Sequence, residues 1–199
     1  SNGRMVLGVG SGWMEEEFKA LKTAEFAVRG TVTDEYIDIF KKVSAGGTVF
    51  HHGEHYCFDP VHCYPESVQR PHPPILIGGV SNRALRRVAE KGDGWISVSL
   101  NSRDIPLRLE KLSQLCEKNG RSLGDLWLCH KLFISIGQEQ PDLQGERKMG
   151  TGSVQDITDD MKRLRDHGYR SIIFRYPEFS IVEQNRQFDI LADKIMPKI

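Results

Sequence analysis

The chain alternates between short apolar runs and longer stretches in which apolar residues recur every three or four positions. The apolar runs show no strict two-residue alternation, which is typical of parallel strands that are buried on both faces. We predict strands over residues 5–9, 74–79, 94–100, 126–137 and 169–177. A helical pattern follows each predicted strand, and these patterns cover residues 15–21, 82–92, 104–120, 154–168 and 185–199.

Two further elements lie between the first and second predicted strands. Residues 33–43 have helical periodicity, with Thr33 or Asp34 as the N-cap. The apolar side of this helix consists of Tyr36, Ile37, Ile39, Phe40 and Val43. Residues 48–59 contain two short β-prone pieces around Gly53, which predicts a surface hairpin.

The strand-then-helix order predicts an α/β protein with a parallel sheet and right-handed crossovers. Two architectures fit this order, namely an open doubly wound sheet and a piece of a (β/α)8 barrel. A complete barrel takes about 250 residues and eight strands. With about five strands, this chain of 199 residues would be about three strands short of one.

Composition and charge narrow the function classes. Hydrophobic residues make up 39% of the chain, which is enough for one core, so we predict a single domain over residues 3–199, with Ser1 and Asn2 as an expression-tag remnant. Basic and acidic residues both total 27, and this balance argues against nucleic acid or a membrane surface as partner. No run resembles a membrane span or signal peptide, so we expect a cytoplasmic protein acting on a small molecule. The four cysteines lack a CxxC pair, which favours reduced thiols.

A glycine turn is the first candidate site. Gly78 and Gly79 end a predicted strand, and Val80, Ser81 and Asn82 open the next helix. Backbone N–H groups at such a turn can hold a phosphate. The alternative is a tight connection in which Ser81 or Asn82 only caps the helix.

A similar arrangement recurs near the C-terminus. Thr151, Gly152 and Ser153 precede a helix that carries Asp156 in its first turn. Phosphate sites in (β/α)8 barrels often use the loops after the last two strands. This loop is therefore a second candidate region for a site.

The loop "GVGSGW" lacks the third glycine of a dinucleotide-binding fingerprint at the required spacing, so we reject a Rossmann site. As a loop at the end of a barrel strand it would place Gly10, Ser11, Gly12 and Trp13 at the active-site face. Trp13 would then contact a ligand, or else cover the barrel mouth as a packing residue.

Histidines and cysteines crowd between residues 51 and 72, and His51, His55 and Cys57 would share one side of the hairpin. The spacing lacks the close pairs of structural zinc sites, so we favour structural roles and predict no metal.

Polar residues in the later strands offer only partial catalytic candidates. His130 is either an acid or base facing the barrel or a hydrogen-bonded core residue. Arg175 could hold an anion or form a salt bridge across the barrel mouth, and Tyr176 and Glu178 follow it. No nucleophile with a partnered base is recognisable, so the catalytic residues stay unassigned.

Several segments keep a recognisable order along nearly the whole chain: "GRMVLGVGSGWMEEEFKAL", "DEYIDIFKKV", "HGEHYCFD", "QRPHPPILIGG", "ALRRVAEKGDGWI" and "LADKIMPKI". Together they resemble the bacterial luciferase-like superfamily, especially its F420-dependent oxidoreductases. Members are TIM barrels that bind F420 or FMN, and "MVLGVGSGW" resembles their fourth strand. The resemblance implies an incomplete barrel of about five parallel strands, with flanking helices and a small hairpin insertion.

The same resemblance implies roles and a function. Gly78, Gly79 and Val80 would lie at the phosphate of F420, or of FMN as the alternative, and residues 10–13 would face the reactive ring or the substrate. By the same resemblance, Thr151 and Gly152 would make direct or supporting phosphate contacts. The expected activity is hydride transfer to or from F420, or FMN-mediated oxygenation, on an unidentified small molecule. The alternative is a non-catalytic member that binds a cofactor or serves in assembly. Because an open parallel sheet leaves two edges, we expect a homo-oligomer, most simply a dimer.

Overall fold

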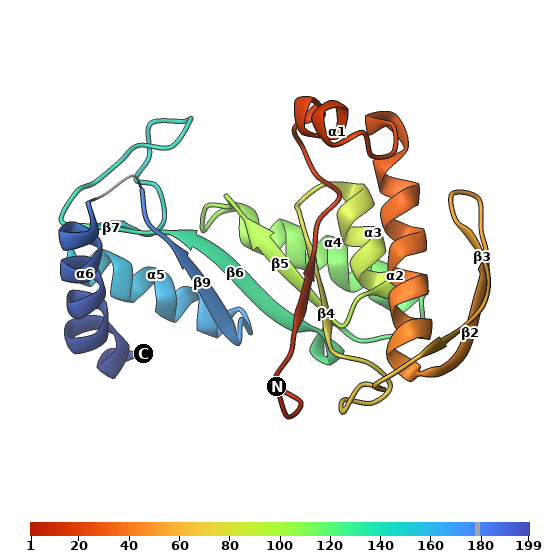
Figure 1. Ribbon diagram of the computed structural model, residues 1–199. Helices are drawn as coiled ribbons and strands as arrows, with labels where there is room; N and C mark the ends of the chain where they lie inside the picture. The colour runs from red at the N-terminus through yellow and green to blue at the C-terminus, as the bar shows by residue number, and fades with distance from the viewer. Residues whose placement is uncertain (178–179) are drawn as a thin grey trace.

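The computed structural model describes residues 1–177 and 180–199, and its centre is a five-stranded parallel sheet (Figure 1). The strand order is β1-β4-β5-β6-β9. These strands cover Leu7–Val9, Ile75–Gly78, Gly94–Val98, Trp127–Phe133 and Ser171–Arg175. Every neighbouring pair is parallel, which confirms the predicted incomplete barrel.

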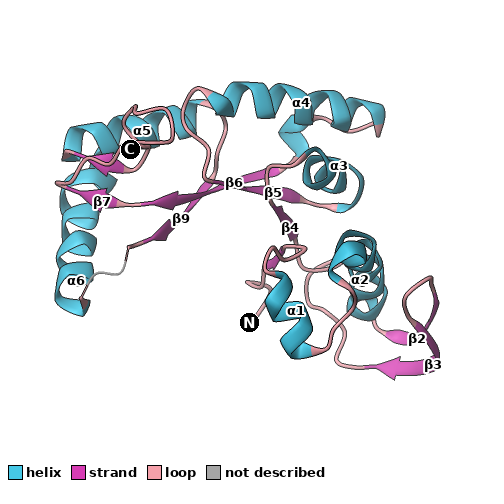
Figure 2. Ribbon diagram, turned by 90° about the horizontal axis from the view of Figure 1, so that it is seen from above, coloured by secondary structure: helices cyan, strands magenta, loops and turns pink. Residues whose placement is uncertain are grey.

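Helices cover one side of this sheet, and Figure 2 shows α3, α4 and α5 lying along that side. The helices are α1 Glu15–Leu21, α2 Arg29–Ala45, α3 Asn82–Lys91, α4 Asp104–Lys118, α5 Val154–Asp166 and α6 Ile181–Ile190. The core lies between the helices and the sheet, where Trp95, Leu112, Leu132 and Ile157 are almost completely buried. This burial supplies most of the driving force for the fold.

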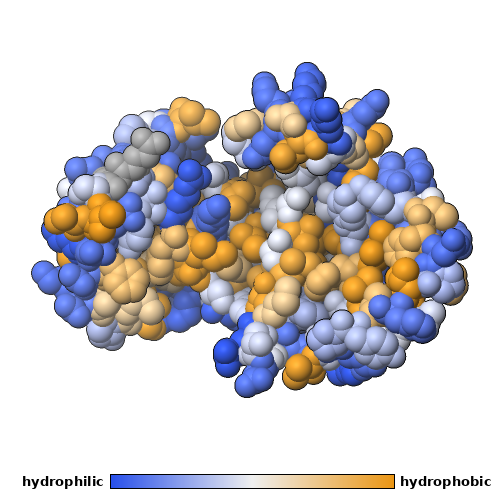
Figure 3. Space-filling model, viewed as in Figure 1, coloured by the Kyte–Doolittle hydropathy of each residue, from blue (hydrophilic) through white to orange (hydrophobic). Residues whose placement is uncertain are grey.

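The other face of the sheet is the inner side of the half-barrel. It carries Ile96, Lys131 and Ile173, which alternate along their strands with the core residues. Ile173 keeps 42% of its surface exposed. Figure 3 shows apolar residues in the hollowed centre of this face.

The helix predicted over residues 33–43 is longer than expected, and the predicted cap is wrong. It begins at Arg29, so Thr33 and Asp34 lie inside it. The Thr33 hydroxyl donates a hydrogen bond to the Arg29 carbonyl, and Asp34 pairs with Arg87 of α3. Tyr36 was predicted on the apolar side, but it is half exposed and stacks on Tyr56 of the hairpin.

Two other boundaries differ from the predictions. Residues 126–137 are not one strand: β6 ends at Phe133, and Ser135–Ile136 form β7, which pairs in parallel with β8 at Thr151–Gly152. The last helix begins at Ile181 instead of residue 185, because the Ser180 hydroxyl caps it by accepting from the Glu183 N–H.

The predicted hairpin is confirmed as an antiparallel pair, β2 at Gly47–His52 and β3 at Cys57–Cys63. In contrast, β1 is half exposed instead of buried, since it is an edge strand of the sheet. The four cysteines are free thiols, as expected. Within the described residues, no helix combines the length and the apolarity needed to cross a membrane.

Candidate functional site

A cavity of about 910 Å³ opens at the C-terminal ends of β5, β6 and β9. This is the edge of the sheet where the active sites of (β/α)8 barrels are built. Its walls come from five parts of the chain. They are Trp13, residues 98–101 with Asp104, residues 130–133, residues 141–144 with 148–149, and Arg175.

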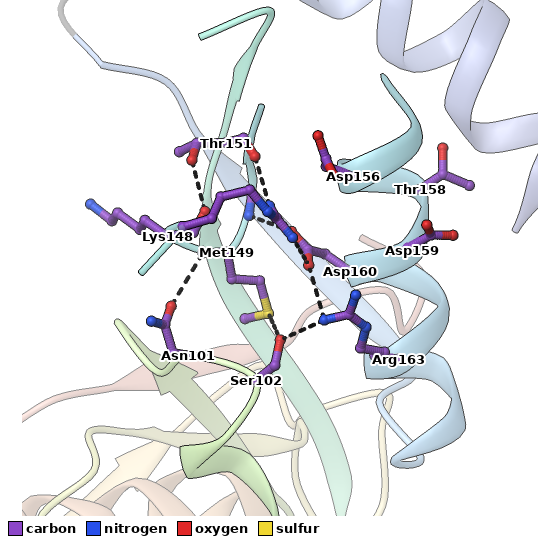
Figure 4. Close-up of polar contacts among 12 residues, drawn as sticks. Asn101, Ser102, Lys148, Met149, Thr151, Asp156, Thr158, Asp159, Asp160 and Arg163 are labelled. Carbon is purple, nitrogen blue, oxygen red and sulfur yellow. Dashed lines mark hydrogen bonds and ion pairs between the residues drawn. The ribbon is translucent and has the colours of Figure 1, made fainter. Parts of the chain in front are cut away.

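One wall of the cavity is the long loop between β7 and β8, and a buried ion pair fixes the base of that loop. The Nη1 and Nη2 atoms of Arg147 donate to the carboxylate of Asp160, at 2.8 and 2.7 Å. Asp160 lies in α5, is completely buried, and also accepts the Gly150 N–H at 2.8 Å. Figure 4 shows Asp160 facing the loop that carries Lys148, Met149 and Thr151. The pairing raises the pKa of Arg147, because Asp160 favours the charged guanidinium.

The tip of the same loop is tied to the connection between β5 and α4. Asp142 accepts hydrogen bonds from the side chains of Asn101 and Arg103, and Asn101 accepts the Met149 N–H at 3.2 Å. Burial acts to raise the pKa of Asp142. Hydrogen bonds from the Gln144 and Glu146 N–H groups and the positive charge of Arg103 act in the opposite direction and are stronger together, so the pKa of Asp142 is lowered. Asp142 is therefore a charged anchor for the loop, with its oxygens already engaged.

A hydrogen-bonded set of core side chains reaches the cavity at His130. The Ser97 hydroxyl lies 2.6 Å from Nδ1 of His130 and 3.0 Å from the Tyr169 hydroxyl. Burial lowers the pKa of His130 to about 4 and raises that of Tyr169 to about 12. His130 is thus neutral at neutral pH. It is a hydrogen-bonded core residue, as one of the two interpretations predicted, and it also lines the cavity.

The glycine turn lies beside this cavity, at the end of β4, the neighbour of β5 in the sheet. Gly79 has φ +119°, a conformation that side-chain-bearing residues rarely adopt, and its N–H donates to the Ile96 carbonyl. Ser81 caps α3 by accepting the Ala84 N–H, so Asn82 is not the cap. Among the described residues, the N–H groups of Val80 and Ser81 have no acceptor. They are the free donors of the turn.

Comparison with known proteins places this fold in a family. A model of the luciferase-like monooxygenases matches residues 1–180. The chain belongs to the luciferase-like monooxygenase family. The FMNH2-dependent dimethylsulfone monooxygenase of Pseudomonas putida is 30% identical over 126 residues, which are 62% of this chain and 34% of that enzyme.

Solved structures agree on the fold of this luciferase-like chain. An F420-dependent secondary alcohol dehydrogenase, in complex with an F420-acetone adduct, matches 98% of the chain and 70% of its own length, with a TM-score of 0.78 and 13% identity. The F420-dependent tetrahydromethanopterin reductase of Methanopyrus kandleri matches 98% of this chain and 74% of its own, with a TM-score of 0.74 and 15% identity. The chain spans about a third to three fifths of the curated relatives it matches.

Of the residues predicted to bind the cofactor of this luciferase-like chain, Trp13 lines the cavity. It follows β1 and is 80% exposed. Gly10, Ser11 and Gly12 precede it in the same loop, where the Gly12 carbonyl accepts a hydrogen bond from Arg29. This loop therefore reaches the cavity through Trp13.

Thr151 and Gly152 lie behind the cavity wall, not on it. Both are buried in β8, and their N–H groups donate to the carbonyls of Lys148 and Gln138. The Thr151 hydroxyl also donates to Lys148. Ser153 and Asp156 form a capping box at the start of α5. In this geometry Thr151 and Gly152 fix the base of the loop, and a phosphate contact from either would be indirect.

The histidine-rich hairpin has structural contacts. Nε2 of His51 lies 2.9 Å from the carboxylate of Glu35, which also accepts the N–H groups of His55 and Tyr56. Within the described part of the chain, no group of three or more His, Cys, Asp or Glu side chains could hold a metal ion. The Glu35 contacts join the hairpin to α2.

The end of β9 carries the other candidate residues. Arg175 lines the cavity and has no salt bridge among the described residues. Within the part of the chain that the structure describes, the buried hydroxyl of Tyr176 has no hydrogen-bond partner, and burial raises the pKa of Tyr176. Glu178 lies outside the described residues.

Sequence reasoning missed several residues that line the cavity: Asn101, Lys131, Phe133, Asp142, Lys148 and Met149. Lys131 gave one usable signal, because a lone lysine inside an apolar strand must reach solvent or a polar cavity. Asp142, Lys148 and Met149 could not be recognised from the sequence, because the pairing of β7 with β8 is what brings their loop over the sheet.

Proposed function

We propose that this domain binds a flavin-type cofactor and serves in an oxidoreductase reaction on a small organic substrate. F420 is our first candidate and FMN the alternative. The observation that carries the proposal is the turn after β4, where Val80 and Ser81 offer free N–H groups beside a large cavity. Membership of the luciferase-like family and the flavin-type relatives support it.

The residues present fit a phosphate-bearing group. The turn is accessible, because Gly78, Gly79 and Val80 are partly exposed and Ser81 is exposed. The N-terminus of α3 adds the partial positive charge of a helix dipole, which favours a phosphate at this end of the helix. A side chain at Gly79 would force the strained backbone conformation and bring a Cβ atom within 3.1 Å of Ala84.

A bound flavin or deazaflavin would supply the hydride or electron chemistry, and the protein would supply placement and electrostatics. In this proposal the turn holds the phosphate and Trp13 covers one side of the cavity. His130 is buried with its ring bonded to Ser97, and in this proposal it supports the cavity wall from the core side. The competing proposal is a non-catalytic domain that retains the fold alone.

Equilibrium binding of F420 and of FMN, followed by cofactor fluorescence, tests the proposal. We expect saturable binding of one cofactor at micromolar concentration, and at least about tenfold weaker binding in Gly79→Val, because a charge-assisted hydrogen bond contributes about 1.5–3 kcal/mol. Gly120→Val is the matched control, since Gly120 also has positive φ, +67°, but lies at the far end of α4.

Circular dichroism should show both variants folded. If the wild-type chain binds neither cofactor at high protein concentration, the non-catalytic alternative is the better description. If Gly120→Val weakens binding as much as Gly79→Val, the loss reflects backbone strain in general and the turn is not the phosphate site.

A further inference from the structure

We propose that the cavity holds the oxyanion of an amphipathic organic molecule, and that Lys131, Lys148 and Arg175 bind this oxyanion around the ring of Phe133. The inference deepens the proposed function, because it concerns the same cavity. It stands on a different set of residues from the glycine turn, so it can be tested without a cofactor.

The sheet register brings two of these cations together. Phe133 of β6 pairs with Arg175 of β9, and Lys131 pairs with Ile173. Because side chains alternate between the faces of a strand, Lys131, Phe133 and Arg175 all point to the inner face of the half-barrel. Neighbouring strands lie about 4.8 Å apart, so the side chains of Arg175 and Lys131 flank Phe133 at the strand ends.

The third cation comes from the loop between β7 and β8. Nζ of Lys148 lies over the Phe133 ring, 4.5 Å from its centre. This cation–π contact places a positive charge on the same ring that Arg175 and Lys131 flank. Three segments distant in the sequence thus converge on one point of the cavity wall.

The three cations have no acidic partner within residues 1–177 and 180–199. Among the described residues, none of the three cations has a salt bridge. Two carboxylates also line the cavity. Asp142 is already bound to Arg103 and Asn101, and Asp104 lies at the start of α4. An excess of cations around a concave surface attracts an anion.

Apolar residues contribute about half of the rest of the cavity wall. Leu100, Leu132 and Met149 are buried behind the cavity, while Trp13 and Leu143 lie exposed on its outer side. A ligand with an oxyanion at one end and an apolar body would match both parts. Two sources have this chemistry: the acid group of an organic substrate, and the phosphate of a flavin-type cofactor, which would then lie here instead of at the glycine turn. Arginine binds both kinds of oxyanion through paired N–H donors.

Isothermal titration calorimetry with the whole chain separates these possibilities. Octanoate probes an acid with an apolar body, 1-octanol has a similar body without the charge, and FMN against riboflavin probes the phosphate. The test variants are Arg175→Gln and Lys131→Gln. The control is Lys111→Gln, an exposed lysine on α4 outside the cavity.

We expect octanoate to bind more tightly than 1-octanol, and each test variant to weaken octanoate or FMN at least about tenfold, as expected for a lost charge-assisted contact. Weakening of octanoate alone assigns the oxyanion to a substrate, and weakening of FMN but not riboflavin assigns it to a cofactor phosphate. Either result supports the oxyanion site. Octanoate binding without any flavin binding would keep this proposal and reject the proposed function.

The proposal is wrong if both test variants bind octanoate and FMN as the wild type does. It is also wrong if Lys111→Gln weakens binding to the same extent, because the effect would then come from overall charge. Increasing salt should weaken the interaction in the wild type more than in Arg175→Gln.

Discussion

The buried carboxylate of Asp160 should be essential for the loop that forms one wall of the cavity. Replacing it by asparagine preserves the shape of the side chain but removes the charge that faces Arg147. Asp160 is completely buried, while the Arg147 side chain is 20% exposed. The substitution therefore leaves a guanidinium mostly buried without its partner and weakens the acceptor of the Gly150 N–H.

The magnitude follows from this geometry. Removing one partner of a buried ion pair costs about 3–5 kcal/mol of stability. Because 20% of the Arg147 side chain is exposed and can be hydrated, we expect a loss of stability at the lower end of this range, about 3 kcal/mol. For a chain of 199 residues this corresponds to a fall in Tm of about 6–12 °C.

Urea unfolding followed by circular dichroism measures the change, and an unaltered m-value would show that the unfolded state is unaffected. The matched control is Asp159→Asn, one residue earlier in α5, where the carboxylate only accepts from Gln155. We expect the control to stay within about 0.5 kcal/mol of the wild type. Trypsin should also cut faster after Arg147 or Lys148 in Asp160→Asn. A loss below about 1 kcal/mol, or equal losses in both variants, would refute the role assigned to Asp160.

Two further predictions concern pH and assembly. Burial lowers the pKa of His130 to about 4, below its ordinary value of 6.5. As the pH falls, the unfolded chain therefore binds a proton at this residue before the folded chain does. Folding stability is retained above pH 6.5 and lost towards pH 4. The loss is on the order of 3 kcal/mol, and urea unfolding at several pH values should show this slope in the wild type but not in His130→Gln; equal slopes would contradict it. The strands β1 and β9 end the sheet, and their edges should favour self-association. We expect light scattering at micromolar concentration to give the mass of a dimer, and a monomer mass would overturn this expectation.

Much of the fold follows from local sequence patterns. The apolar runs and the helical periodicity predicted the five parallel strands and their succession along the chain, because strands buried in a parallel sheet form apolar runs. The start of α2 was missed because its cap has no side-chain hydrogen bond and the usual capping residues lie one turn later. The break after Phe133 was missed because Ile134, Ser135 and Ile136 continue the same apolar pattern into another sheet.

The candidate site was less predictable than the fold. A glycine pair before a helix marks the turn locally, so Gly78 and Gly79 could be read from the sequence. The cation cluster depends on the register between β6 and β9 and on the loop that returns Lys148 to Phe133. Neither the register nor the path of the loop is encoded in local periodicity. The charges of distant residues could be combined only once the tertiary structure was known.

Because β7 pairs with β8, the loop that forms one wall of the cavity could be replaced by a different loop without a change in the sheet. The two short strands hold the ends of residues 137–150 side by side, so the length and composition of the loop can change while its attachment points stay fixed. Doubling the length of such a loop costs only about 0.6 kcal/mol in closure entropy. Natural variation or laboratory grafting could therefore alter ligand preference in this segment while the parallel sheet and the glycine turn stay the same.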